Sequence, residues 1–458
     1  MLPFLWRIRL AKRPLRFFEN RRFQSALAAS RPTINNVLGK EYPTDKRTNI
    51  TPAIIEKLGR NLYLQPSHPL DILRTLIESH FSNFTAHSGF SPIVTPAKNF
   101  DDLGFPADHP GRALSDSYYI NDGLMLRTHT SAHEVEVFAR GDRRWLLTSD
   151  VYRRDEIDST HYPVFHQMEG ARVFSSSQEG VDEAEADNAR LSAHLAQSNI
   201  VIEDVPHSSS TNPIPGIHST EHAERMVLNL KLSLNSLMLA LFGGRAGSAE
   251  EPLRVRWIEA YFPFTSPSFE VEVFFHGKWL EILGCGLVQQ RTLQLANIPH
   301  DVSWAFGLGL ERIAMILFAI PDIRLFWSTD PRFLGQFTPG KISTFKPYSR
   351  YPPCYRDVSF WLPYQGLHDN DIFDLIRDAV GDLAEDVKMI DSFTHPKTQR
   401  TSRCYRINYR SMDRQVSSLS SVCSLDDIRA RSLSNDEASV LHAGVITQLK
   451  EKFGVEVR

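Results

Sequence analysis

Cysteine is scarce in this sequence, with only four in 458 residues. Cys285, Cys354, Cys404 and Cys423 are far apart and form no Cys-x-x-Cys pair. A disulfide framework in a small domain, or a zinc ion held by cysteines, needs closely spaced pairs. We therefore expect reduced thiols and no zinc site.

Other patterns are also missing. No apolar run is long enough to cross a bilayer, so we expect no membrane association. His129 and His133 have the i, i+4 spacing of a metal pair, but no His-Glu-x-x-His motif and no acid at a ligand interval accompany them. Gly307 and Gly309 lack the third glycine and the βαβ context of a dinucleotide fingerprint. These absences favour polar substrate contacts over zinc and exclude a Rossmann domain.

The composition is that of a large globular protein, with 42% hydrophobic and 23% charged residues. A chain of 458 residues is too long for one ordinary core and favours two or three domains.

Residues 1–31 differ from the rest. They hold eight basic residues and one acid, Glu19, with apolar and aromatic residues interspersed. This pattern is typical of a mitochondrial transit peptide, and a basic surface helix of the mature protein is the alternative. The segment contributes +7 to the formal net charge of −3, which leaves −10 for the remainder. A globally basic nucleic-acid-binding protein is therefore excluded.

Residues 32–335 show a mixed helix and strand pattern. Hydrophobic periodicity predicts helices over 69–89 and 221–242 and strands over 90–95 and 164–174. Strands over 269–275 and 279–283 form a hairpin through residues 276–278. We expect an α+β fold in which helices flank an antiparallel sheet.

A polar stretch without periodicity, Gly335 to Lys346, predicts an interdomain linker, which we place at residues 336–347. Residues 348–458 then follow the order β-α-β-β-α-β of a ferredoxin-like domain. The expected strands are 356–362, 387–394, 402–412 and 455–457, the helices are 371–383 and 436–453, and 417–433 is a loop insertion.

Two arginines lie at the ends of predicted elements. Arg153 follows an apolar strand, and Asp155 shares its strand face and can hold the guanidinium group. Arg312 begins an otherwise apolar helix, so its charge must be paired or directed at an anion. Each arginine alone fits a structural ion pair, but guanidinium groups also suit phosphate because their planar fork donates in parallel. Together they suggest nucleotide chemistry.

Strand alternation over 164–174 projects Gln167 and Glu169 from one face. Phe262-Pro-Phe264 is an aromatic cluster just before a strand. Core packing and a wall around an aromatic ligand are equally good explanations of this cluster.

Six segments occur in a characteristic order. They are Leu126-Arg-Thr-His-Thr-Ser-Ala-His133, Asp150-Val-Tyr-Arg-Arg-Asp155, Phe165-His-Gln-Met-Glu169, Phe262-Pro-Phe-Thr265, Gly284-Cys-Gly286 and Trp304-Ala-Phe-Gly-Leu-Gly-Leu-Glu-Arg312. With these six segments the chain resembles the class II aminoacyl-tRNA synthetases, and among them the single-chain phenylalanyl-tRNA synthetases of mitochondria. The resemblance extends from about residue 40 to 458. It implies a class II catalytic domain at 32–335 and an anticodon-binding domain at 348–458.

The resemblance implies that phenylalanine and ATP form phenylalanyl-adenylate, whose acyl group then passes to the phenylalanine tRNA. Arg153 corresponds to the arginine at the α-phosphate and the attacking carboxylate, and Arg312 to the arginine at the γ-phosphate. The residues implied at the amino acid are His129, Ser131, Gln167, Glu169, Phe262, Phe264 and Ala305. Those implied at ATP also include Asp155, Thr160, His161, Tyr162, Phe165, Glu281 and Phe306.

Within this set, residues 160–162 correspond to a mobile loop over ATP and Phe306 to the position that stacks on adenine. Glu281 corresponds to an acid that contacts the substrate or Mg²⁺, which prefers hard oxygen ligands. The residues that line the same site are Ala132, His133, Glu134, Met168, Gly284 and Gly286. Many relatives carry glutamine where this chain has Glu134, which leaves the contact of that residue open.

Lys397, Arg400, Arg406 and Arg410 concentrate positive charge in the second domain. We expect them to contact tRNA phosphates, and a solvated surface is the alternative. The resemblance further implies a monomer of the mitochondrial matrix without an editing domain.

The sequence argues against two other functions. A catalytically silent relative would have lost Arg153, Arg312 or the pair Gln167 and Glu169, and all of these are present. A class II ligase for tyrosine or another amino acid is disfavoured by the aromatic wall of Phe262 and Phe264 and by the absence of a second acid placed for a phenol.

Overall fold

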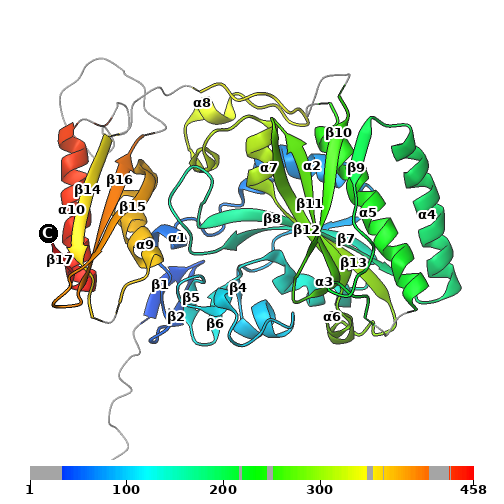
Figure 1. The fold of residues 1–458 in the computed structure, drawn as a ribbon, viewed down its shortest axis with the longest axis horizontal. Coiled ribbons are helices and arrows are strands. Elements are labelled where there is room, and N and C mark those ends of the chain that lie inside the picture. The colour runs from blue at the N-terminus through cyan, green and yellow to red at the C-terminus, as the bar shows by residue number, and fades with distance from the viewer. Residues whose placement is uncertain are drawn as a thin grey trace, which may run out of the picture.

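The computed structural model describes residues 33–215, 219–244, 251–347, 354–364, 366–411, 433 and 435–458. The expected transit peptide, most of the expected loop insertion at 417–433 and Cys423 lie outside these residues. Figure 1 shows a larger domain built around a central sheet and a smaller domain that carries the C-terminus.

A sheet of eight strands forms the centre of the larger domain (Figure 1). In spatial order the strands are β3 (Thr85–His87), β7 (Arg144–Tyr152), β8 (Val164–Phe174), β13 (Val302–Gly309), β12 (Lys278–Val288), β11 (Thr265–Phe275), β10 (Leu253–Ala260) and β9 (Ile200–Glu203). Every pair from β7 to β10 is antiparallel, whereas the outer strands β3 and β9 run parallel to their neighbours. The expected antiparallel sheet is confirmed in its centre and differs at both edges.

Helices cover both faces of this sheet. On one face α2 (Pro69–His80), α5 (Thr220–Phe242) and α7 (Leu310–Leu317) bury their apolar sides in the main core, and α4 (Gln178–Ala196) packs against α5. On the other face α3 (Glu134–Ala139) and α6 (Gln290–Leu295) share a smaller core with alternate residues of β7 and β8. Both faces of the central strands are therefore covered, which explains why every residue of β7 after Arg144 is buried, polar residues included.

The helix expected over 221–242 is confirmed as α5. Contrary to the expectation that no such run exists, α5 is long and apolar enough to cross a bilayer by length and composition. In the structure 78% of its apolar window is buried inside the protein. α5 is therefore a core helix.

Three local expectations have different outcomes. α2 ends at His80, well before Gly89, and is followed by β3, so the helix expected over 69–89 was too long. The strand expected over 90–95 is reduced to β4 (Ile93–Val94). The hairpin is confirmed, with a turn at His276 and Gly277, whose φ angles of 48° and 80° suit the twist of paired strands.

Shorter elements complete the larger domain. β1 (Thr33–Val37) pairs with β2 (Lys40–Pro43), and β4, β6 (Leu124–Leu126) and β5 (Tyr119–Asn121) form a third sheet. The remaining elements are α1 (Pro52–Ile55), α8 (Pro331–Leu334), a π-helical turn at Ala97–Asp101, and 3-10 turns at Leu62–Leu64, Pro110–Arg112, Thr130–His133 and Ile323–Trp327. The turn Thr130–His133 leads directly into α3 and carries part of the site described below.

The segment expected as a linker packs on the larger domain. Phe337 and Phe345 are buried, and both rings contact Phe333 at centroid distances of 5.2 and 5.7 Å. The Phe345 N–H group donates to the carbonyl of Phe318 at 2.7 Å. Up to residue 347 the chain is therefore attached to the larger domain.

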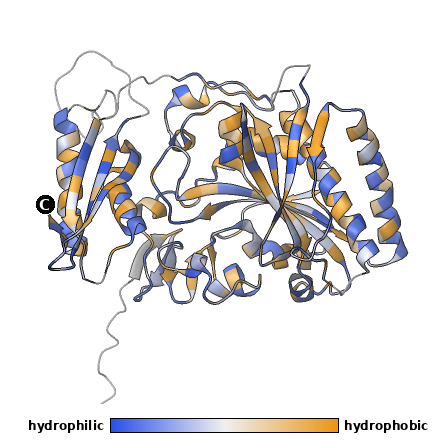
Figure 2. Cartoon of the chain, in the orientation of Figure 1, coloured by the Kyte–Doolittle hydropathy of each residue, from blue (hydrophilic) through white to orange (hydrophobic). Residues whose placement is uncertain are grey.

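The smaller domain has the ferredoxin-like arrangement. Its elements are β14 (Cys354–Trp361), α9 (Asp369–Val380), a 3-10 turn (Gly381–Leu383), β15 (Ala384–Thr394), β16 (Thr401–Tyr409), α10 (Asn435–Phe453) and β17 (Glu456–Val457). The strand order β15-β16-β14-β17, with all pairs antiparallel, confirms the expected fold. Figure 2 shows hydrophilic and hydrophobic residues mixed along α10 and α4, as expected for outer helices with one side in solvent.

Candidate active site

A cavity of about 750 Å³ opens at the centre of the larger domain, over strands β8, β11, β12 and β13. The expected site residues among its walls are His129, Ser131, Arg153, Asp155, His161, Gln167, Glu169, Phe262, Phe264, Glu281, Gly284, Ala305 and Phe306. Sequence reasoning missed others, including Phe100, Phe105, His109, Asp116, Ser117, Arg154 and Tyr261. Most of the missed residues lie on irregular segments between residues 100 and 117, where no periodic pattern marks them.

Strand register explains why polar and small residues meet here. Glu169 of β8 lies beside Gly307 of β13, which in turn lies beside Gly284 of β12. Gln167 and Ala305 occupy the same face, because alternate residues of a strand point to one side. A Cβ atom at Gly307 would meet nothing within 4 Å, so the floor of the cavity is open there.

A β-bulge turns an acid toward the same cavity. The register between β11 and β12 shifts where Glu281 faces Glu272, and Ile282 is the extra residue. Glu281 thereby comes onto the face of Gly284 and lines the cavity. Its carboxylate lies 3.5 Å from Nη1 of Arg312, and both side chains are more than half exposed. This loose pair leaves both groups free to meet a charged ligand.

The helix that carries Arg312 is fastened to β8 by a buried pair. Glu311 accepts hydrogen bonds from the His166 backbone N–H group at 2.8 Å and pairs with its Nδ1 atom at 2.6 Å. The two side chains are 0% and 3% exposed. This contact fixes α7 against the strand that carries Gln167 and Glu169, so the spacing between the two halves of the site is set.

Aromatic rings form one wall of the cavity. The rings of Phe262 and Phe264 lie 6.0 Å apart, and Phe105 lies 5.8 Å from Phe264 and 5.5 Å from His129. A Cβ atom on Gly284 would lie 2.6 Å from Cζ of Phe262, so only glycine permits this ring position. The wall is therefore continuous and apolar.

His129 adds a neutral polar group to this wall. Burial and the nearby charge of Arg153 lower the pKa of His129 to about 3, so its ring is uncharged at neutral pH. Neither ring nitrogen has a hydrogen-bond partner among the described residues. One nitrogen can therefore donate to a bound ligand and the other can accept.

Arg153 is held by a backbone carbonyl and not by the acid expected from the sequence. Its Nε atom donates to the carbonyl of Thr128 at 2.8 Å, and its guanidinium carbon lies 5.3 Å from the ring centre of Phe165. Asp155 instead accepts a hydrogen bond from the N–H group of Glu156 at 2.9 Å. Both residues still line the cavity.

The loop between β7 and β8 only partly fits the expected cover over ATP. Thr160 and His161 bond to Asp158 at 2.9 and 2.8 Å, and His161 reaches the cavity. Tyr162 is 5% exposed, stacks on Trp327 and donates to Asp382 of the smaller domain at 2.7 Å. Tyr162 therefore belongs to the junction between the domains, which corrects its expected place at ATP.

Two further expectations fail because of strand alternation. The backbone of Phe306 borders the cavity, but its ring is on the helix side of the sheet, where the residue is 2% exposed and stacks on Phe81 at 5.6 Å. Met168 is also fully buried in the main core, on the opposite face from Gln167. Both side chains therefore point away from the cavity, into the main core.

The turn Thr130–His133 borders the site from the side of α3. The Thr130 N–H group donates to Oε1 of Gln167 at 3.2 Å. Ala132, His133 and Glu134 are 3%, 2% and 1% exposed and lie behind the cavity wall. Gly286 also lies outside the wall, where a Cβ atom would come within 2.3 Å of the Pro267 carbonyl.

The expected tRNA-binding residues lie on the smaller domain, and three of the four are in ion pairs. Arg400 pairs with Glu456, Arg406 with Asp357 and Arg410 with Glu385 at 2.9, 2.8 and 2.9 Å. Lys397 is exposed.

The outer face of the sheet in the smaller domain is partly aromatic. Arg406 lies over the ring of Tyr355 at 4.8 Å, and Tyr355 is 59% exposed. Tyr405, Ile407 and Tyr409 point inward and are fully buried, as strand alternation requires. This outer face therefore presents an exposed aromatic ring, and its arginines are already in ion pairs.

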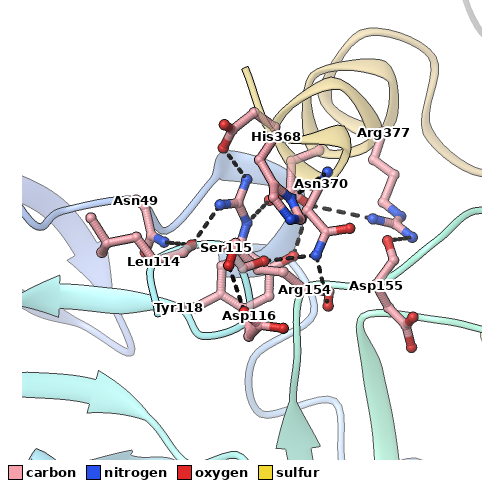
Figure 3. A network of polar contacts seen from close by, with 12 residues as sticks. Asn49, Leu114, Ser115, Asp116, Tyr118, Arg154, Asp155, His368, Asn370 and Arg377 are labelled. Atoms are coloured by element: carbon pink, nitrogen blue, oxygen red, sulfur yellow. Dashed lines mark hydrogen bonds and ion pairs between the residues drawn. The ribbon is translucent and has the colours of Figure 1, made fainter. Parts of the chain in front are cut away.

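The two domains meet at Arg154, the residue that follows Arg153 in the chain (Figure 3). The next residue, Arg154, is buried and donates to Asp374 and Asp371 of α9, both at 2.7 Å. Asp374 also accepts from the hydroxyl of Tyr118 at 2.8 Å. Arg377 of α9 donates to the carbonyl of Asp155 at 2.7 Å.

The loop continues into the smaller domain. Ile157 is 5% exposed and belongs to the hydrophobic core of that domain. Its carbonyl accepts a hydrogen bond from the N–H group of Val387 in β15 at 3.0 Å. The loop that follows Arg153 is therefore held by the smaller domain at Arg154, at the Asp155 carbonyl and at Ile157.

Comparisons with known proteins agree with this architecture. Residues 55–177 and 216–337 match the family described as tRNA synthetases class II core domain (F), and residues 349–420 match the ferredoxin-fold anticodon binding domain. The mitochondrial phenylalanine–tRNA ligase of Saccharomyces cerevisiae is 43% identical over 95% of this chain and 97% of its own length. The mitochondrial enzyme of Mus musculus is 43% identical over 86% of each chain.

A solved structure gives a weaker match. The pyrrolysyl-tRNA synthetase of Desulfitobacterium hafniense has a TM-score of 0.36 and 15% identity, and covers 63% of this chain and 80% of its own.

The sheet, its helices and the family match over more than half of the chain define a class II aminoacyl-tRNA synthetase. The near full-length identity to the yeast enzyme gives the narrower assignment. The chain belongs to the mitochondrial phenylalanine–tRNA ligases.

Proposed function

We propose that this chain attaches phenylalanine to the phenylalanine tRNA in two steps, by way of phenylalanyl-adenylate formed with ATP. The observation that supports this function best is a single cavity that combines an aromatic wall, the polar pair Gln167 and Glu169, and Arg153. The reaction needs these three environments for a phenyl ring, an ammonium group and a phosphate.

The aromatic wall and the polar pair bind the amino acid in this proposal. Phe262 and Phe264 enclose the phenyl ring, and Ala305 leaves room at its far edge. Gln167 and Glu169 hold the ammonium group, while His129 and Ser131 contact the carboxylate side. A wall without a free acid near the ring selects against tyrosine, because the phenol would remain unpaired.

The arginines supply positive charge to the activation step. Arg153 contacts the α-phosphate and the attacking carboxylate, cancels part of their repulsion and stabilises the charge that develops at phosphorus. Arg312 leaves Glu281, 3.5 Å away, to bind the γ-phosphate of the departing pyrophosphate. No proton transfer is needed in this step.

We place the adenine ring against Phe165 rather than Phe306. Phe165 lies on the same face of β8 as Gln167, is half-buried, and has the Arg153 guanidinium 5.3 Å from its ring centre. An aromatic ring beside a guanidinium group offers a flat surface for a base.

Glu281 and Glu270 suit a magnesium ion that accompanies ATP. They lie on the same face of adjacent strands, and burial together with the charges of Glu281 and Glu272 raises the pKa of Glu270. A divalent cation would relieve this repulsion and find the hard oxygen ligands it prefers. When bound, the ion supplies positive charge to the phosphates.

In the second step the acyl group passes to the 2′-hydroxyl of the terminal adenosine of the tRNA. The smaller domain binds the anticodon in this proposal, and the Tyr355 and Arg406 surface suits unstacked bases better than a purely electrostatic contact does. We place the enzyme in the mitochondrial matrix, in keeping with the mitochondrial relatives. We further propose that it acts as a monomer.

Exchange of radiolabelled pyrophosphate into ATP tests the first step. The purified chain should catalyse exchange with phenylalanine and at least a hundredfold less efficiently with tyrosine. Absence of phenylalanine-dependent exchange would contradict the proposed function. Charging of phenylalanine tRNA by the same preparation tests the second step.

A further inference from the structure

We propose that Glu134 is a positioning residue for the ammonium-binding carboxylate: Glu134 and Glu169 share one proton while the amino-acid site is empty, and the ammonium group of phenylalanine displaces that proton to solvent. The inference rests on the proposed function, because it assigns Glu169 to the ammonium group. It makes phenylalanine binding a proton-releasing reaction.

The positions of the two acids support this role. Glu134 follows the turn Thr130–His133 and lies one helical turn after Ser131, which lines the cavity. Glu169 projects from β8 into the cavity wall, next to that turn. Glu134 is 1% and Glu169 3% exposed, so water does not solvate either carboxyl group well.

Each of the two carboxyl groups has an unused oxygen. Oε2 of Glu134 and Oε2 of Glu169 are both buried and have no hydrogen-bond partner among the described residues. Two ionised carboxylates in one buried place repel each other, and one proton between them gives a donor to one acid and an acceptor to the other. A shared proton therefore removes the repulsion between the two carboxylates and gives each unused oxygen a hydrogen-bond partner.

Among the described residues, the cations next to α3 and the turn before it are paired with other groups and not with Glu134. On the same helix, Glu136 is occupied by Lys98 and Arg140 at 2.6 and 3.0 Å and points away from the cavity. His133 of the preceding turn contacts Arg127, and Arg291 of α6 is exposed. The charge that acts on Glu134 is that of Glu169.

Both acids consequently bind protons more strongly than usual. Burial, followed by the charge of Glu169, raises the pKa of Glu134 well above its usual range. Burial raises the pKa of Glu169 to about 7, against the opposing effect of hydrogen bonds from Thr130 and Ser131. A substrate ammonium group supplies the missing positive charge, so the pair ionises and one proton goes to the buffer.

Calorimetric titration with phenylalanine, repeated in buffers of different ionisation enthalpy at pH 7, measures the protons released. We expect the full chain to release close to one proton per bound phenylalanine and Glu134→Gln to release about half a proton or less, because burial alone raises the pKa of Glu169 to about 7. Glu134→Asp, which keeps the acid, should restore the release. Glu136→Gln on the same helix is the matched control and should behave as the unsubstituted chain.

A pH profile gives a second readout. KM for phenylalanine in pyrophosphate exchange should rise about tenfold per pH unit as the unsubstituted chain is acidified below pH 7, and this rise should begin at lower pH in Glu134→Gln. Changes in kcat should be small. A purely structural role for Glu134 would alter stability without moving this profile.

The outcomes separate the two proposals. Equal proton release by the unsubstituted chain and Glu134→Gln overturns the shared proton, and so does phenylalanine binding without proton release by the unsubstituted chain, whatever the folding of the variants. A chain that neither binds phenylalanine nor exchanges pyrophosphate overturns the proposed function instead.

Discussion

Arg153 is positioned by the backbone, so its charge is available to a ligand. Among the described residues, its side chain donates one hydrogen bond, to the carbonyl of Thr128 at 2.8 Å. Removal of the side chain therefore leaves no buried charge unpaired elsewhere. The function of this residue can be tested with little effect on folding.

Arg153→Ala should lower pyrophosphate exchange at least a thousandfold while the melting temperature changes by no more than about 2 °C, because one lost surface contact costs little. Arg190→Ala on α4, whose side chain is 69% exposed, is the matched control for loss of a positive charge. Exchange within a factor of ten of the unsubstituted chain would refute the assignment of Arg153.

The buried acids make stability depend on pH. In the unfolded chain both glutamates lose their protons near pH 4.5, whereas in the folded chain Glu169 titrates at about 7 and Glu134 well above its usual range. As pH rises from 4.5 toward 7, the folded state holds protons that the unfolded state has lost, so folding stability falls. This loss is the cost of burying acids without a ligand.

Glu134→Gln removes one of these acids and should stabilise the ligand-free chain. The gain should be small at pH 5 and grow toward pH 8, by at most about 1.4 kcal/mol per pH unit. Thermal unfolding of both proteins at these two pH values measures it. A gain that is equal at pH 5 and pH 8 would show that Glu134 is not protonated in the folded chain.

At the scale of single elements, successive side chains of β13 point alternately into the cavity and into the main core. Ala305 and Gly307 face the cavity, while the ring of Phe306 fills the main core over Gly170 of β8. The strand fits only because Gly170 has no side chain. A Cβ atom there would lie 2.5 Å from Cε1 of Phe306 and 2.8 Å from Cδ2 of Leu146.

Gly170→Ala should therefore destabilise the protein by about 1–3 kcal/mol, because the core must shift to admit the methyl group. Gly307→Ala, on the paired strand, meets no atom within 4 Å and should leave stability almost unchanged while it lowers kcat/KM by intruding on the cavity floor. Urea unfolding and pyrophosphate exchange measure the two effects. Equal loss of stability in both variants would contradict this division of the strand.

The same alternation shows what the sequence could and could not predict. The period of two in β8 was sufficient to place Gln167 and Glu169 together, and the same reasoning applied to β13 would have excluded Phe306 from the adenine site. Nothing local could indicate the bulge at Ile282 or the contribution of Phe105, since both depend on contacts with distant strands. Regular elements were therefore predictable, and the loops that close the site were not.

The whole molecule is organised by the junction between its domains. Arg154 donates a hydrogen bond to Asp374 of α9, which also accepts one from the hydroxyl of Tyr118. Figure 3 shows Arg154, Asp155 and Tyr118 together at this junction. No sequence pattern indicated this junction, because the partners are more than 200 residues apart. The sequence predicted a linker at residues 336–347, but this segment packs on the larger domain.

Asp374→Asn should weaken the docking of the smaller domain by about 1–3 kcal/mol, because Arg154 keeps only Asp371 as a charged partner. Small-angle scattering of the free chain should show a larger radius of gyration for this variant. Asp391→Asn, at an exposed position of β15, is the control. An unchanged scattering profile would show that docking does not depend on this pair.

Ile157 adds a consequence for the design of shorter proteins. Its side chain comes from the larger domain but completes the hydrophobic interior of the smaller one. A chain truncated at residue 347 would expose an isoleucine in the loop after Arg153, and the isolated C-terminal fragment would have a void where that side chain was. The two modules are separable as sequences but not as folding units, so heating should melt them in one cooperative transition.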